Sequence, residues 1–65
     1  MTVVLNGERA ETLGARTIAE LAECYGLHPN SILIEHNGTA LHRREWEREL
    51  AEEDRIEFIR VVAGG

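Results

Sequence analysis

Ile56-Glu57-Phe58-Ile59-Arg60-Val61-Val62 is the stretch that decides the fold of this chain. It is the most apolar segment, and its β-branched and aromatic residues predict a strand. Ile56 and Phe58 point to one side of that strand, whereas Ile59 and Val61 point to the other. A strand that is apolar on both sides is usually central in its sheet and covered on both faces. We therefore expect residues 56–62 to form the central strand.

The second face of this strand has no obvious cover in the sequence. Only one substantial helix is predicted, and one helix covers one face of a sheet. Uncovered apolar residues form exposed patches, which tend to mark interaction sites. If Val3 and Leu5 of the first strand face the helix, Val4 joins Ile59 and Val61 on the other side. We expect Val4, Ile59 and Val61 to form a partner-binding face.

The predicted central strand runs into a tail, Val62-Ala63-Gly64-Gly65. Because Gly64 and Gly65 have no Cβ, this segment fits channels that are too narrow for side chains. It presents the α-carboxylate of Gly65 on a thin stem. The simpler interpretation is a frayed chain end, since termini are commonly disordered. We expect residues 62–65 to form a flexible, protruding tail.

Two Asn-Gly pairs, Asn6-Gly7 and Asn37-Gly38, predict two β-hairpins. Asn-Gly is the strongest short hairpin signal, because a type I′ turn needs positive φ at both central positions. The strands that flank these turns are predicted at residues 2–5, 8–13, 31–36 and 39–41.

The main helix is predicted to begin at Thr17, where Thr17 and Glu20 form a capping box. One apolar face follows at helical spacing, made of Ile18, Leu21, Ala22 and Tyr25. Gly26 is placed to end the helix in a left-handed conformation. The pattern predicts one amphipathic helix of about ten residues, packed on the sheet.

A second, shorter helical element is predicted from Arg43 to Leu50. It is heavily charged, and Trp46 and Leu50, four residues apart, are its expected anchors in the core. This element is expected to lie over the edge of the core.

Length and composition bound the possible functions. The chain has 65 residues, which is one small domain with a thin core. Its net charge of −5 argues against nucleic acid, and its longest apolar runs are too short to span a bilayer. It has one cysteine and no signal peptide, so a cytoplasmic location is expected. A walled catalytic cleft is hard to build on this scale, so we do not expect an enzyme.

No metal site is expected. Cys24 and His28 are four residues apart, but Gly26 and Pro29 break the helix that would align them. Only two ligands would be present, whereas structural zinc sites use four. Cys24 beside the apolar face of the helix is predicted to be a packing residue.

The order of these elements, with a protruding tail, is that of the ubiquitin-like β-grasp. The chain resembles the ThiS-type sulfur carrier proteins of thiamine biosynthesis over essentially its whole length. The segments that carry the resemblance are Leu5-Asn6-Gly7, Thr17-Ile18-Ala19-Glu20-Leu21, Glu35-His36-Asn37-Gly38, Arg43-Arg44-Glu45-Trp46, Asp54-Arg55-Ile56-Glu57 and Val62-Ala63-Gly64-Gly65. The resemblance implies an α+β fold with a mixed sheet of four to five strands, packed on one main helix and a short helical turn.

The resemblance also implies a chemistry centred on Gly65. A ThiF-like adenylyltransferase would use ATP to activate its carboxylate, and a sulfur donor protein of the cysteine desulfurase or rhodanese type would convert it to a thiocarboxylate. A ThiG-like thiazole synthase would then accept the sulfur. Val62, Ala63 and Gly64 would be recognised as the tail. The carrier itself would have no catalytic residues and no bound cofactor, and would be a monomer when free.

Three positions depart from the pattern of the family, namely His36, His42 and Glu53. The first two are expected at the rim of the sheet and the third in a turn, so none affects the tail. The nearest rival function is that of the small subunit of molybdopterin synthase (MoaD-like), also a β-grasp sulfur carrier ending in Gly-Gly. Two more distant rivals are a ubiquitin-like protein modifier and a β-grasp binding module without tail chemistry.

Overall fold

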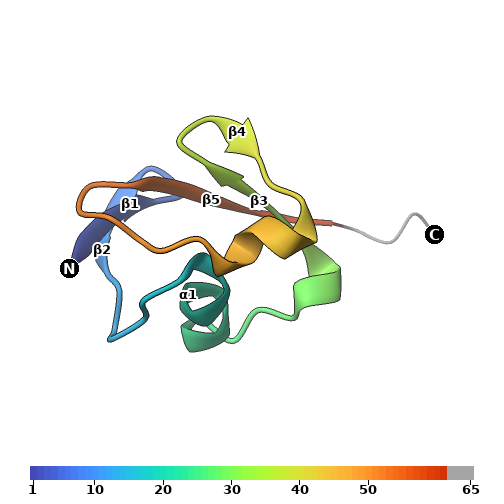
Figure 1. Cartoon of the computed structure of the whole chain (residues 1–65), viewed down its shortest axis with the longest axis horizontal. Helices are drawn as coiled ribbons and strands as arrows, with labels where there is room; N and C mark the ends of the chain where they lie inside the picture. Colours follow the sequence, from blue (N-terminus) through green and yellow to red (C-terminus); the bar gives the residue numbers. More distant parts are fainter. Residues whose placement is uncertain (62–65) are drawn as a thin grey trace.

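The computed structural model describes residues 1–61. The predictions for the tail, at Val62, Ala63, Gly64 and Gly65, lie outside the described residues. The described part forms a sheet with one α-helix against it and two short 3₁₀ helices, η1 and η2 (Figure 1). The elements are β1 (Thr2–Leu5), β2 (Glu8–Glu11), α1 (Ile18–Cys24), η1 (Pro29–Ser31), β3 (Ile32–His36), β4 (Thr39–Ala40), η2 (Arg43–Glu47) and β5 (Arg55–Arg60).

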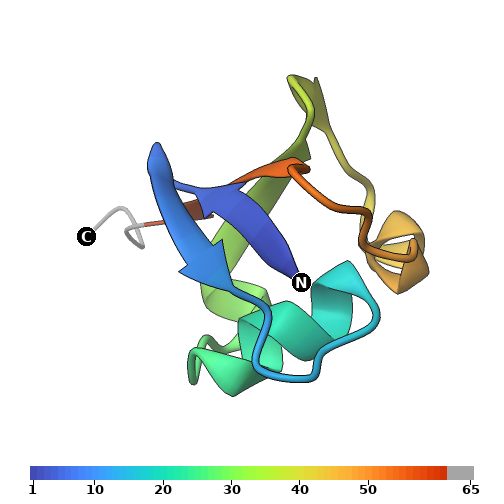
Figure 2. The same cartoon turned by 90° about the vertical axis from the view of Figure 1, so that its left-hand side faces the viewer.

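The strands form one mixed sheet in the order β2-β1-β5-β3-β4. β5 is parallel to β1 and antiparallel to β3, and both hairpins are antiparallel. The central position predicted for the last strand is therefore confirmed. Figures 1 and 2 show α1 on one side of this sheet, and no other element of residues 1–61 covers the opposite side. We call that opposite side the outer face.

Both predicted Asn-Gly turns are confirmed. Asn6 and Asn37 have φ of 50° and 51°, and the glycine after each has φ of 86°. Each asparagine also contacts the backbone of β5. The Oδ1 atom of Asn6 accepts the Phe58 N–H at 2.8 Å, and that of Asn37 accepts the Arg55 N–H at 2.8 Å. The two turns thus hold the start and the middle of the central strand.

The start of α1 follows the prediction with one change. The Oγ1 atom of Thr17 accepts the Glu20 N–H at 3.1 Å, as an N-cap should. The carboxylate of Glu20 accepts the N–H of Arg16 at 2.7 Å, rather than that of Thr17. The capping carboxylate therefore reaches one residue further back than in a standard capping box.

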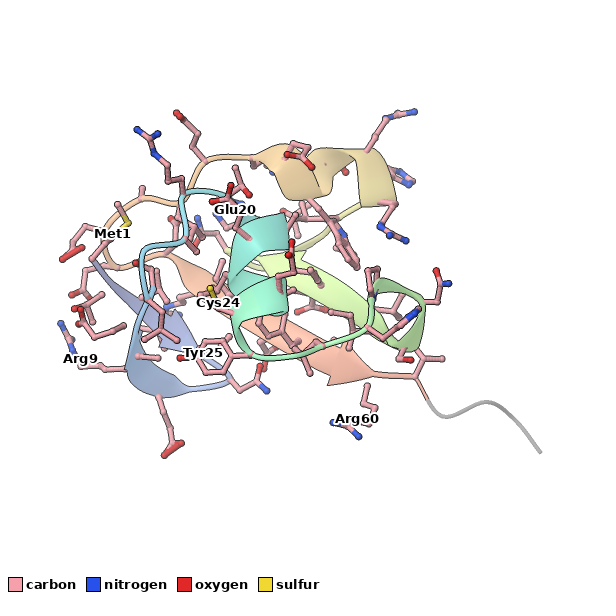
Figure 3. All side chains as sticks on the ribbon, turned by 90° about the horizontal axis from the view of Figure 1, so that it is seen from below. Met1, Arg9, Glu20, Cys24, Tyr25 and Arg60 are labelled. Atoms are coloured by element: carbon pink, nitrogen blue, oxygen red, sulfur yellow. The ribbon has the colours of Figure 1, made fainter. Side chains whose placement is uncertain are left out.

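The end of α1 comes earlier than predicted, and the helix has 7 residues instead of about ten. Gly26 has φ of 69°, and the Leu27 N–H donates to the Ala22 carbonyl at 3.0 Å, which is a Schellman motif. Tyr25 was wrongly assigned to the apolar face, because it caps the helix and is 41% exposed. Its hydroxyl instead donates to the Glu11 carbonyl at 3.3 Å, beside β2 (Figure 3).

The core lies between α1, the inner face of the sheet and the segment that contains η2. Trp46 and Leu50 are buried, so both predicted anchors are confirmed. Arg43 stacks on the Trp46 ring at 4.8 Å from its centroid, a cation–π contact. The buried apolar residues are Val3, Ala15, Ile18, Leu21, Ala22, Ile32, Ile34, Trp46, Leu50 and Ile56.

Three further predictions are corrected. The second strand ends at Glu11 instead of residue 13, because Leu13 has φ of 57° and is exposed. Cys24 is exposed rather than packed, because it lies at the last turn of α1 on the side away from the core (Figure 3). Ser31 belongs to η1 instead of the following strand. Among the described residues, no helix is long and apolar enough to cross a membrane.

Candidate functional site

The two sides of β5 have different surroundings, as its sequence predicts. Ile56 is completely buried, and Phe58 packs against the core. Ile59 points to the outer face and is 40% exposed. On β1, Val3 is buried and Val4 is half-buried on the outer side. The predicted assignment of faces is therefore confirmed on both strands.

An apolar patch occupies one end of the outer face. Leu33 of β3 is the register partner of Ile59 and is 59% exposed. Val61, 45% exposed, follows on the same side of the chain, and its N–H donates to the Ser31 carbonyl at 2.8 Å. We call Leu33, Ile59 and Val61 the apolar patch. Sequence analysis missed Leu33, although Ile32-Leu33-Ile34 is apolar on both sides in the same way as the last strand.

Val4 does not belong to this patch. Its register partner on β5 is Arg55, four residues before Ile59. At about 3.3 Å per residue, the two positions are separated by about 13 Å along the strand. The predicted face of Val4, Ile59 and Val61 is thus divided into an apolar patch and a separate end that contains Val4.

The end that contains Val4 is charged and hollowed. A hollow of about 770 Å³ lies between the two Asn-Gly turns, and Glu35, Arg55 and Glu57 line it together with Val4. Glu35 and Glu57 are register partners on β3 and β5. The outer face therefore has an apolar end near the last described residues and a charged end at the start of β5.

A buried polar network fixes the start of β5. The Oδ2 atom of Asp54 accepts hydrogen bonds from His36 Nε2 and from the Ala51 N–H, both at 2.9 Å. Its Oδ1 atom accepts one from Asn37 Nδ2 at 3.2 Å. Burial alone would raise the pKa of Asp54, but these donors outweigh it and lower the pKa below its ordinary value.

The surroundings of His36 differ from those expected. It was expected at the rim of the sheet, but its side chain is only 13% exposed and pairs with Asp54. The sequence contained no local signal for the pair, because the two residues are 18 positions apart. The network links the second hairpin to the loop before β5, so its role is to position the central strand.

The side chains that commonly ligate metals do not gather at one place in residues 1–61. No group of three or more histidine, cysteine, aspartate or glutamate side chains there could hold a metal ion. His28 caps η1, and its Nδ1 atom accepts the Asn30 N–H at 3.1 Å. The Nδ1 atom of His28 is therefore occupied by the backbone of η1.

Comparison with known proteins agrees with this geometry. The family model of the ThiS family matches residues 3–65. Among solved structures, the thiamine biosynthesis protein (ThiS) from Geobacter metallireducens is similar, with a TM-score of 0.82 and 25% sequence identity. The match covers 100% of both chains. No curated protein sequence matches this chain.

Proposed function

The chain belongs to the ThiS family, and from this premise we propose that it is a sulfur carrier protein of thiamine biosynthesis. The observation that carries the proposal is the family match, which extends over residues 3–65 and so includes Gly64 and Gly65. The β-grasp fold and the solved structure of a thiamine biosynthesis protein with the same fold support it.

The reacting atom in this proposal belongs to the C-terminal carboxylate of Gly65. A carboxylate resists nucleophiles because it is negatively charged, so an adenylating enzyme first joins it to AMP, with release of pyrophosphate from ATP. A protein persulfide displaces AMP, and reduction of the resulting acyl disulfide by a thiol leaves the thiocarboxylate. Gly64 and Gly65 suit this sequence of steps, because the activating site must surround the last carbonyl closely.

The folded body supplies affinity in this proposal, and the tail supplies the reacting atom. The carrier is then a co-substrate of a ThiF-like adenylyltransferase and a ThiG-like thiazole synthase, with no catalytic residues and no cofactor of its own. The apolar patch is the proposed docking surface, because it is exposed and follows directly along β5 toward the tail. Val4 is proposed to contact partners at the charged end.

Intact mass spectrometry tests the proposal. Incubation with ATP, the adenylating enzyme and a sulfur donor should add the mass of one oxygen-to-sulfur exchange, mapped to the C-terminal peptide. A variant without Gly65 is the matched control, and it should gain no sulfur while keeping the same thermal unfolding midpoint. Absence of the thiocarboxylate in the wild-type chain would contradict the carrier function.

The acceptor enzyme decides between the two sulfur-transfer pathways. Both kinds of carrier present the same thiocarboxylate, so discrimination must come from the folded body. We expect the thiocarboxylated carrier to support thiazole formation with thiazole synthase and not to replace the small subunit of molybdopterin synthase. Sulfur release should be measured with each acceptor, and molybdopterin formation alone would reverse the assignment.

A further inference from the structure

Two glutamates stand opposite each other on the outer face. Glu35 and Glu57 are register partners on β3 and β5. The hydrogen bond from the Val61 N–H to the Ser31 carbonyl sets the phase of this antiparallel ladder. In this phase, the backbone N–H and C=O groups of Glu35 and Glu57 face each other. In such a pair of the ladder the Cα atoms are about 5.5 Å apart. Their side chains therefore leave the sheet from adjacent positions on the outer face.

Neither carboxylate has an ionic partner in the described part of the chain. None of the ion pairs among residues 1–61 contains Glu35 or Glu57. Two other charged groups of the sheet are already engaged, since Arg9 pairs with Glu53, and Glu11 lies 3.7 Å from the amino group of Met1. Arg55, on the same side of β5 as Glu57, forms no ion pair with either glutamate. The repulsion between Glu35 and Glu57 is thus not relieved by an ion pair within this part of the chain.

Like charges directly opposite each other destabilise a sheet. The cost falls on the two central strands of a small domain, where little stability is available to offset it. We propose that Glu35 and Glu57 receive one basic side chain of the partner protein, an arginine or a lysine, when the outer face docks. This inference rests on the proposed carrier function and names the chemistry of the partner surface.

The strand geometry places this acidic pair at a defined distance from the apolar patch. Leu33 precedes Glu35 by two residues on β3, and Ile59 follows Glu57 by two residues on β5. Residues two apart on a strand share a face and lie about 7 Å apart. The matching partner surface therefore has an apolar contact and a basic group separated by about 7 Å.

Arg55 limits what else could occupy the charged end. It lines the same hollow as the two glutamates, so the three side chains carry a net charge of −1. One additional cation balances this charge, whereas a second would face Arg55. A planar guanidinium can bond to two carboxylates at once, which suits a single arginine best. A second copy of the chain fits less well, because it would bring its own acidic pair to the interface.

Binding of the full-length chain to the adenylating enzyme tests the inference. We would measure the affinity at low and at physiological ionic strength for the wild type and the double variant Glu35→Gln/Glu57→Gln. Glu23→Gln is the matched control, because Glu23 is exposed on α1. The double variant should bind about tenfold more weakly at low ionic strength and lose most of its salt dependence. The control should bind within about twofold of the wild type.

A charge reversal separates docking from folding. Glu57→Arg should pair with Glu35 across the strands, raise the thermal unfolding midpoint and weaken enzyme binding further than Glu57→Gln. A purely structural role would not move stability and affinity in opposite directions.

Three outcomes would overturn the inference. If the double variant binds as tightly as the Glu23→Gln control and keeps the salt dependence of the wild type, the acidic pair is not part of the interface. A wild-type dimer that Ile59→Glu dissociates, with enzyme affinity unchanged, would assign the face to a second copy. If the wild type neither binds the adenylating enzyme nor gains sulfur, the proposed function itself fails, and the inference fails with it.

Discussion

The two faces of the sheet contain similar apolar residues, yet they have different exposures. On β3, Ile34 is 1% exposed and its neighbour Leu33 is 59% exposed. On β5, Ile56 is completely buried and Ile59 is 40% exposed. Both strands are central and apolar on both sides, but α1 covers only one of those sides (Figure 2). The comparison shows that strand composition alone does not say which apolar residues stabilise the folded chain.

The energetic difference between the faces follows from burial. Complete burial of an isoleucine side chain stabilises the fold by about 1.5–3 kcal/mol relative to exposure. An outer residue such as Ile59 gains only part of that amount in the free carrier. The remaining apolar surface is available for a partner, which is why we assign stability to the inner face and docking to the outer face.

The largest expected effect is therefore on the inner face. Ile56→Ala should lower the free energy of unfolding by about 3 kcal/mol, because it leaves a cavity in a fully buried part of the core. Urea denaturation measures this difference, and Ile59→Ala on the same strand is the control, with a loss below about 1 kcal/mol. Equal losses for the two variants would contradict the division between the faces.

Local sequence patterns predicted the elements well, because they depend on neighbouring residues. The two Asn-Gly turns, the Thr17 cap and the Gly26 stop are local features, and each appears in the structure. The lengths of α1 and β2 were overestimated, because Tyr25 and Leu13 are apolar but lie past the points where the backbone turns away from the core.

The proposed docking face was only partly predictable, because it depends on register. Alternation assigned Val4 and Ile59 to the same side of the sheet, but it could not say how far apart they lie. That distance follows from the pairing of Val4 with Arg55, which joins residues from opposite ends of the chain. The Glu35–Glu57 pair was missed for the same reason, since it depends on the register of β3 and β5.

A medium effect on stability is expected at Asp54, the residue just before β5. Asp54→Asn should lower the free energy of unfolding by about 1–3 kcal/mol at neutral pH, because the buried hydrogen bonds from His36 and Ala51 lose their charged acceptor. Chemical denaturation across a range of pH values measures both the loss and its dependence on pH.

The sign of that pH dependence follows from the lowered pKa of Asp54. A group whose pKa is lowered by folding stabilises the protein above its unfolded pKa, about 3.9 for aspartate. This contribution is lost as the pH falls through the lower, folded pKa. The wild type should therefore lose more stability than Asp54→Asn on acidification below about pH 4. Parallel curves for the two proteins would show that Asp54 is not stabilised as a carboxylate.

The smallest effect on stability is expected on the outer face, with the largest effect on binding. Ile59→Glu should change the free energy of unfolding by less than about 1 kcal/mol, since the side chain is already 40% exposed. The same change should weaken binding to the adenylating enzyme and to thiazole synthase by more than about 1 kcal/mol, as substitutions at the centre of an interface do. Leu33→Glu, at the register partner of Ile59, should have the same effects on stability and binding.

Because both side chains are exposed in the free carrier, unfolding of both variants would mean that the outer face is part of the core. Stable variants with unchanged enzyme binding would instead move the docking surface away from the apolar patch.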